Sequence, residues 1–137
     1  MCTARHAVLE VAQLVLLQSP SGEVLMLEDC DGRWGFPGGR LNEGETWLEG
    51  LQREVKEETG IEHFTLFQPL GVYQRKSRSG GIPVYGVIFS GTITESTVTL
   101  SHEHRSFQWF ISPEDCDDKE FFPREVEALV RAALRRA

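Results

Sequence analysis

REVKEETG, from Arg53 to Gly60, places three carboxylates in less than two turns of a helix. At about 100° per residue, Glu57 and Glu58 both fall within about 60° of Glu54, so the three share one face. Like charges at these spacings destabilise an isolated helix by about 0.2–0.5 kcal/mol per pair. The pattern therefore indicates either a solvated acidic face or the ligands of a divalent cation, which prefers hard oxygen donors.

The helix that carries these carboxylates is predicted over residues 46–59. Thr46 and Glu49 have the spacing of a capping box, and Gly60 stands where a glycine commonly ends a helix. An apolar stripe beside the carboxylates consists of Leu48, Leu51 and Val55. We therefore expect the helix to pack on a sheet by this stripe and to present its carboxylates beside the contact.

Strand and turn patterns surround this helix. Strands are predicted at residues 6–18, 24–28, 64–74, 84–94 and 107–111, with a turn at 19–23, a loop at 29–39 and a basic hairpin tip at 75–81. A closing amphipathic helix over 122–137 has an inner face made of Val126, Leu129, Val130 and Leu134. With 137 residues, the chain is expected to form one domain, 1–137, of the α/β class, with a mixed sheet between helices.

The composition limits the partners and the location of the protein. Acidic residues outnumber basic ones by 21 to 14, for a net charge of −7, so no nucleic-acid partner is expected. Glu10 and Gln13 interrupt the apolar run near the N-terminus, so neither a signal peptide nor a membrane span is expected. A disulfide framework is not indicated, and a cytoplasmic location is expected, because the cysteines are few and scattered: Cys2, Cys30 and Cys116.

A glycine-rich loop precedes the helix and continues its spacing. PGGRLNEGE brings Gly38, Gly39 and Gly44 close to Glu45, and paired glycines let backbone groups approach a ligand closely. From Gly39 to Ile61 the chain matches the pattern G-x5-E-x7-R-E-U-x-E-E-x-G-U, in which U is aliphatic, at every defined position. This pattern is the Nudix box, so the chain resembles the Nudix hydrolases, and the match favours a metal site over a solvated acidic face.

The resemblance implies an α/β/α sandwich with a central box helix and a C-terminal helix. It also implies hydrolysis of a nucleoside diphosphate linked to a further group, with Mg²⁺ or Mn²⁺ as cofactor. The metal ligands would be the box carboxylates, one of which, often the first, acts as base in some members: Glu54, Glu57 and Glu58.

Other box positions have supporting roles in the family. By resemblance, Arg53 orients a neighbouring glutamate and the carbonyl group of Gly38 ligates a metal ion. The structural positions of the box would be Gly39, Glu45 and Gly60, with Glu45 as a salt-bridge partner of Arg53.

A further carboxylate is expected from a loop beyond the box. The candidate is Glu103 in SHEHRSFQWF, just before an aromatic strand, as a metal ligand or base; the alternative is an exposed loop acid. His102 and His104 flank Glu103, but zinc is disfavoured because no third ligand lies at a useful spacing. The two histidines are expected either near the substrate or exposed on the loop.

The substrate class follows only by elimination. The positions at which the ADP-ribose and dinucleoside polyphosphate branches carry a proline or a tyrosine are occupied by Lys76, Ser77, Arg78 and Ser79. A nucleoside triphosphate, cleaved to the monophosphate and pyrophosphate, is therefore expected. The alternatives are ADP-ribose, nucleotide sugars or dinucleoside polyphosphates as substrates, or a non-catalytic module that senses a nucleotide. The complete set of box glutamates favours the enzyme, and a homodimer is a further arrangement to consider.

Two groups of residues are candidates for substrate contacts. Arg75, Lys76 and Arg78 either contact phosphates or form an exposed basic tip. Trp34 and Phe36 either stack on a base or pack within their loop.

Overall fold

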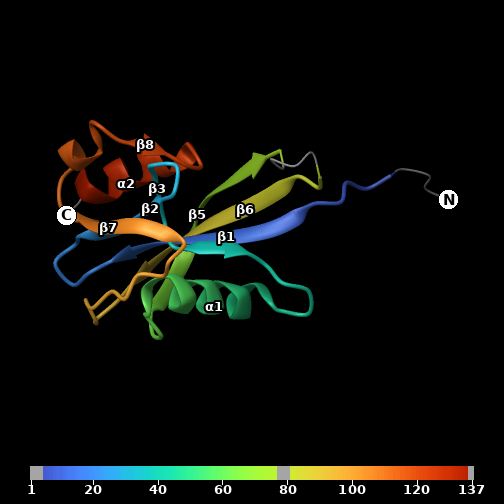
Figure 1. Ribbon diagram of the computed structural model, residues 1–137, viewed down its shortest axis with the longest axis horizontal. Helices are drawn as coiled ribbons and strands as arrows, with labels where there is room; N and C mark the ends of the chain where they lie inside the picture. Colours follow the sequence, from blue (N-terminus) through green and yellow to red (C-terminus); the bar gives the residue numbers. More distant parts are fainter. Residues whose placement is uncertain (1–4, 77–80, 136–137) are drawn as a thin grey trace.

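The computed structural model describes residues 5–76 and 81–135 as a curled mixed sheet between two helices (Figure 1). Helix α1 (Trp47–Thr59) covers one face of the sheet, and α2 (Glu125–Arg135) lies on the opposite side. The predicted α/β/α arrangement is confirmed.

Strand β1 lies inside the sheet and pairs with three other strands, β2, β4 and β6. The strands are β1 (Glu10–Gln18), β2 (Val24–Asp29), β3 (Arg33–Gly35), β4 (Gly38–Arg40), β5 (Thr65–Arg75), β6 (Val84–Thr92), β7 (His104–Phe110) and β8 (Glu120–Phe121). β1 pairs in parallel with β6 and antiparallel with β4. β5 extends this half antiparallel to β6, while β2 pairs antiparallel with both β3 and β7. A short 3₁₀ helix, η1 (Pro113–Cys116), precedes β8, which pairs in parallel with β3.

Alternate residues of β1 serve the two layers of the core. Leu14 and Leu16 belong to the cluster that α2 completes, whereas Val15 and Leu17 belong to the cluster that packs on α1. This alternation is what a strand between two covered faces requires. On α2, the predicted inner face is confirmed: its buried residues are Val126, Val130 and Leu134, and Leu129 is partly buried against them.

Both ends of α1 are as predicted. The side chain of Thr46 accepts a hydrogen bond from the backbone amide of Glu49, and the side chain of Glu49 accepts one from the backbone amide of Thr46, which forms a capping box. Gly60 ends the helix with φ of 77°. Leu51 and Val55 are buried, but Leu48 is 38% exposed, so the apolar stripe is shorter than predicted.

Several element boundaries predicted from the sequence were wrong. Residues 29–39 were predicted as loop, but they contain β3 and the start of β4. The first strand begins at Glu10 rather than at His6, and β7 begins at His104 rather than at Phe107. The short strands escaped prediction because RWG and GGR are too short and too glycine-rich to show alternation.

No helix in the described part of the chain is both long and apolar enough to cross a bilayer. Cys30 and Cys116 are free thiols, and Cys2 lies outside the described residues.

Candidate active site

Two glycines bring the backbone of β4 against β1 and under α1. A Cβ on Gly38, whose φ is 140°, would collide with the carbonyl oxygen of Gln13 and lie 2.7 Å from Cα of Leu14. A Cβ on Gly39 would lie 2.6 Å from the carboxyl carbon of Glu54. Glycine at both positions therefore leaves the space in which the carboxylate of Glu54 lies against β4.

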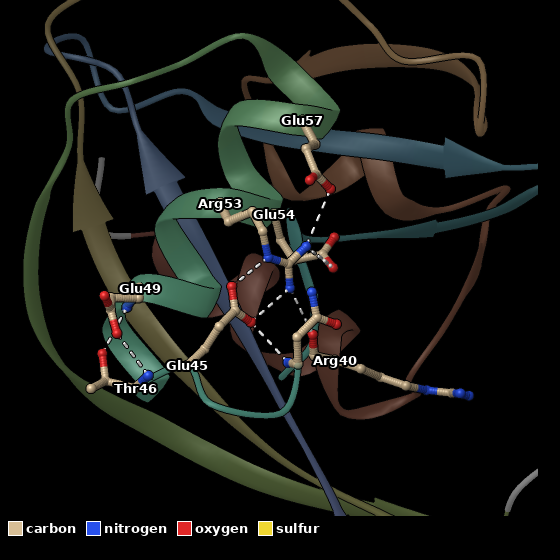
Figure 2. A network of polar contacts seen from close by, with 8 residues as sticks. Arg40, Glu45, Thr46, Glu49, Arg53, Glu54 and Glu57 are labelled. Atoms are coloured by element: carbon tan, nitrogen blue, oxygen red, sulfur yellow. Dashed lines mark hydrogen bonds and ion pairs between the residues drawn. The ribbon is translucent and has the colours of Figure 1, made fainter.

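The guanidinium group of Arg53 lies among the carboxylates of Glu45, Glu54 and Glu57 (Figure 2). It donates two hydrogen bonds to Glu45, from Nε at 2.6 Å and from Nη2 at 3.0 Å. Nη1 donates to Glu54 at 3.0 Å and to Glu57 at 3.2 Å. The salt bridge expected between Arg53 and Glu45 is present, and the bidentate geometry fixes the plane of the guanidinium group. Arg53 thus holds two carboxylates of the face that was identified in the sequence.

The third carboxylate of that face, Glu58, is buried. Its Oε1 accepts a hydrogen bond from the backbone amide of Gly38 at 2.8 Å. Burial raises the pKa of Glu58 to about 8, and the charges of Glu54, Glu103 and Glu57 act in the same direction. Burial also raises the pKa of Glu54, against the opposing effect of Arg53. The site therefore holds more negative charge than its surroundings readily accept.

Glu103 lies on a loop that is fastened to the end of α1. The backbone amide of Ser101 donates to the carbonyl oxygen of Glu58 at 3.2 Å, and the thiol of Cys30 donates to the carbonyl oxygen of Glu103 at 3.4 Å. The charge of Glu103 raises the pKa of both Glu54 and Glu58. The loop therefore places Glu103 close enough to the box helix for its charge to act on two of the three carboxylates that the sequence nominated there.

A small polar cavity of about 90 Å³ adjoins Glu58. It is lined by Leu27, Asp29, Arg33, Gly35, Phe36, Gly38, Glu58, His104 and Phe122. The side chain of His104 is 15% exposed, and burial lowers its pKa. The sequence left His104 either near the substrate or exposed, and it gave no role to Arg33, Asp29 or Phe122. Only the position of His104 next to Glu103 was a signal in the sequence.

The donor atoms of the site suit a hard divalent cation. They are carboxylate oxygens that repel one another, as the raised pKa values of Glu54 and Glu58 show. Within residues 5–76 and 81–135, however, no three acidic, histidine or cysteine side chains converge closely enough to hold a metal ion. The physical reason is that Arg53 holds Glu54 and Glu57, while Gly38 holds Glu58. The donor atoms therefore suit a metal ion chemically, and the carboxylate side chains would have to reorient to bind it.

The residues proposed to contact the substrate lie in different surroundings. The guanidinium group of Arg75 lies 4.6 Å from the ring centroid of Phe122, a residue that lines the polar cavity, and Lys76 is exposed. Arg78 lies outside the described residues. Phe36 is buried in the core on the α2 side, as the packing alternative expects, and it also lines the polar cavity. Trp34 is half-buried, with its ring 5.7 Å from that of Phe110.

Comparison with known proteins gives a consistent picture. A model of the NUDIX domain matches residues 8–133. The 8-oxo-dGDP phosphatase NUDT18 of Danio rerio is 45% identical over 64 residues, which cover 44% of this chain and 19% of that protein. The CTP pyrophosphohydrolase of Escherichia coli is 28% identical over 120 residues, which cover 85% of this chain and 79% of that protein.

The fold is also found in solved structures. The MutT protein from Methanosarcina mazei Go1 superposes with a TM-score of 0.74 at 26% identity, covering 97% of this chain and 98% of that one. The chain spans less than a fifth of the length of the first curated relatives that it matches.

Raising the pH should destabilise the metal-free protein through Glu58. Below about pH 4.5 this carboxyl group is protonated in both the folded and the unfolded chain. Between there and about pH 8 only the unfolded chain releases the proton, so stability falls by about 1.4 kcal/mol per pH unit, and above about pH 8 the loss is complete. Glu58→Gln should therefore gain stability over wild type as the pH rises, measured by urea unfolding in EDTA.

Glu62→Gln is the matched control, because it removes a carboxylate that is 58% exposed and whose charge is not among those that raise the pKa of Glu58. Its unfolding free energy should follow the pH dependence of the wild type. Parallel pH profiles for Glu58→Gln and wild type would contradict the burial of a costly charge at this position.

Proposed function

The chain belongs to the Nudix family, and on this premise we propose that it is a pyrophosphohydrolase that uses Mg²⁺ or Mn²⁺. The observation that carries the proposal is the complete set of box carboxylates at the end of α1, with Glu103 acting on two of them. A module that only senses a nucleotide would not need to keep three mutually repelling carboxylates on one face of a helix.

We propose that the ligands of the metal are the carboxylates of Glu54, Glu57 and Glu58 and the carbonyl group of Gly38. A divalent cation bound there would neutralise the anhydride oxygens, polarise phosphorus and lower the pKa of a bound water. Arg53 keeps Glu54 and Glu57 within reach of one another. Glu103 accepts the proton of the attacking water, and Glu54 is the next candidate for this role.

For the substrate, we propose a nucleoside triphosphate, cleaved to the monophosphate and pyrophosphate. The chain lacks the markers of the ADP-ribose and dinucleoside polyphosphate branches, and one relative that aligns with 85% of the chain is named a CTP pyrophosphohydrolase. Arg75, which lies beside the cavity residue Phe122, is proposed to contact phosphate. The cytoplasmic location and the homodimer stay predictions from the sequence.

A hydrolysis screen tests this proposal. The protein is incubated with Mg²⁺ and nucleoside triphosphates, oxidised triphosphates, ADP-ribose, nucleotide sugars or dinucleoside polyphosphates, and released pyrophosphate and nucleotides are separated by chromatography. We expect turnover of a nucleoside triphosphate. If only another class of compound is hydrolysed, that class replaces the nucleoside triphosphate as the proposed substrate. If no compound is hydrolysed, the sensing module is favoured.

Glu57→Gln should nearly abolish this activity and weaken Mn²⁺ binding while the fold persists. The side chain is 59% exposed, so its loss removes a metal ligand without opening the core. Activity and calorimetric metal titration are compared with those of Glu62→Gln, which alters a carboxylate with 58% exposure whose ion pair is with Lys56. Equal metal affinity and rate in Glu57→Gln and wild type would refute the ligand assignment.

Glu103→Gln should lower kcat by roughly 10²–10⁴, the usual span for the loss of a general base. The rate measured against pH should lose a limb that the wild type shows, and high Mg²⁺ should not restore it. Glu95→Gln, in an exposed segment before the same loop, is the control and should behave as wild type. A smaller loss that high Mg²⁺ recovers would make Glu103 an outer metal ligand, and an unchanged kcat would return the base role to Glu54.

A further inference from the structure

A β-bulge determines which way His104 faces. β2 and β7 pair regularly from Val24 opposite Phe110 to Glu28 opposite Ser106, but the next pair is Asp29 opposite His104. An unbroken ladder would place Arg105 opposite Asp29. Because successive residues of a strand point to opposite faces, the extra residue gives His104 the side that Arg105 would otherwise take.

That side of the sheet is the one that α1 covers. Leu25 and Leu27 precede Asp29 at alternate positions of β2, and both belong to the cluster that packs on α1. His104 therefore lies on the face where the carboxylates of α1 end, and its Nε2 is 3.9 Å from Oε2 of Glu58. Bulges commonly re-aim a side chain next to a functional site.

The charges of Glu103 and Asp29 also act on His104, but Glu103 is exposed and the oxygens of Asp29 are already engaged. Oδ1 accepts hydrogen bonds from the backbone amides of Asp31 at 2.9 Å and Arg33 at 3.0 Å. Oδ2 accepts one from Nε of Arg33 at 3.2 Å. Glu58 is therefore the carboxylate that faces the ring, with its Oε2 3.9 Å from Nε2 of His104, and Nδ1 has no hydrogen-bond partner among the described residues.

The two oxygens of Glu58 thus face donors on two different elements. The backbone amide of Gly38, on β4, donates to Oε1 at 2.8 Å. His104, on β7, faces Oε2 across a gap that is about 1 Å longer than a hydrogen bond. Hydrogen bonds of active sites are often long without ligand and shorten in the complex.

We propose that His104 is a positioning residue, whose Nε2–H holds Oε2 of Glu58 and fixes the direction of the carboxylate toward the metal. The proposal rests on the function proposed above and adds a residue to it. Hydrogen-bond partners of metal-ligating carboxylates orient their ligand, and losing one typically costs 10–100-fold in metal affinity or activity. We expect a loss in that range when the Nε2 donor is removed.

Two substitutions separate the donor from the bulk of the side chain. The amide nitrogen of Gln reaches about as far as Nε2 of histidine, whereas that of Asn reaches only as far as Nδ1. His104→Asn should therefore weaken Mn²⁺ binding about 10–100-fold and lower kcat with little change in KM, and His104→Gln should largely restore both. Affinity is measured without nucleotide, from the free Mn²⁺ signal in electron paramagnetic resonance.

His102→Asn, on the exposed loop at the other side of Glu103, is the matched control and should bind Mn²⁺ as the wild type does. If His104→Asn does not fold, as judged by circular dichroism, His104→Ala replaces it as the variant without a donor. Wild-type Mn²⁺ affinity without the donor would overturn the proposal, and so would a His104→Gln variant as weak as His104→Asn. Wild type that binds Mn²⁺ but hydrolyses no nucleotide would refute the proposed function alone.

Discussion

Repulsion among the carboxylates at the end of α1 is the constraint on which the rest of the structure depends. Glu54, Glu57 and Glu58 share one face, and they lie toward the helix C-terminus, whose partial negative charge adds to the repulsion. The protein offsets part of this with Arg53, which contacts Glu54 and Glu57 and is itself held by Glu45. Among the described residues, the backbone amide of Gly38 is the hydrogen-bond donor to the side chain of Glu58, and burial raises the pKa of Glu58 to about 8.

The fold around the site serves to hold this charge in place. Gly38 and Gly39 let β4 approach closely enough to receive the carboxylates, and the loop of Glu103 is tied to the last turn of α1. In the absence of a cation, such an arrangement costs stability, because a desolvated carboxylate is poorly compensated. A divalent cation would convert the same repulsion into binding energy. The same cation would let a protein with net charge −7 bind the anionic substrate proposed above.

The sequence predicted the parts of the site that depend on local spacing. The caps of α1 and its carboxylate face follow from side chains that lie within a few turns of one another, whereas the pair formed by Arg53 and Glu45 was expected from the resemblance to the Nudix box. The strand at Gly38 was missed because glycines carry no alternation. The orientation of His104 could not be predicted, because a one-residue bulge changes the face of the sheet to which the side chains point and has no signature in the sequence. The surroundings of Phe36 and Arg75 could not be predicted either, because they depend on contacts between segments that are distant in the sequence.

The most direct measurement is the free energy of unfolding of the wild type and of the triple variant Glu54→Gln, Glu57→Gln and Glu58→Gln, each with EDTA and with Mn²⁺. The account predicts that at pH 8 the triple variant is more stable than the wild type in EDTA, because the repulsion is gone. It also predicts that Mn²⁺ stabilises the wild type and leaves the variant unchanged. Equal stabilisation of both proteins by Mn²⁺, or a triple variant less stable than the wild type in EDTA, would contradict it.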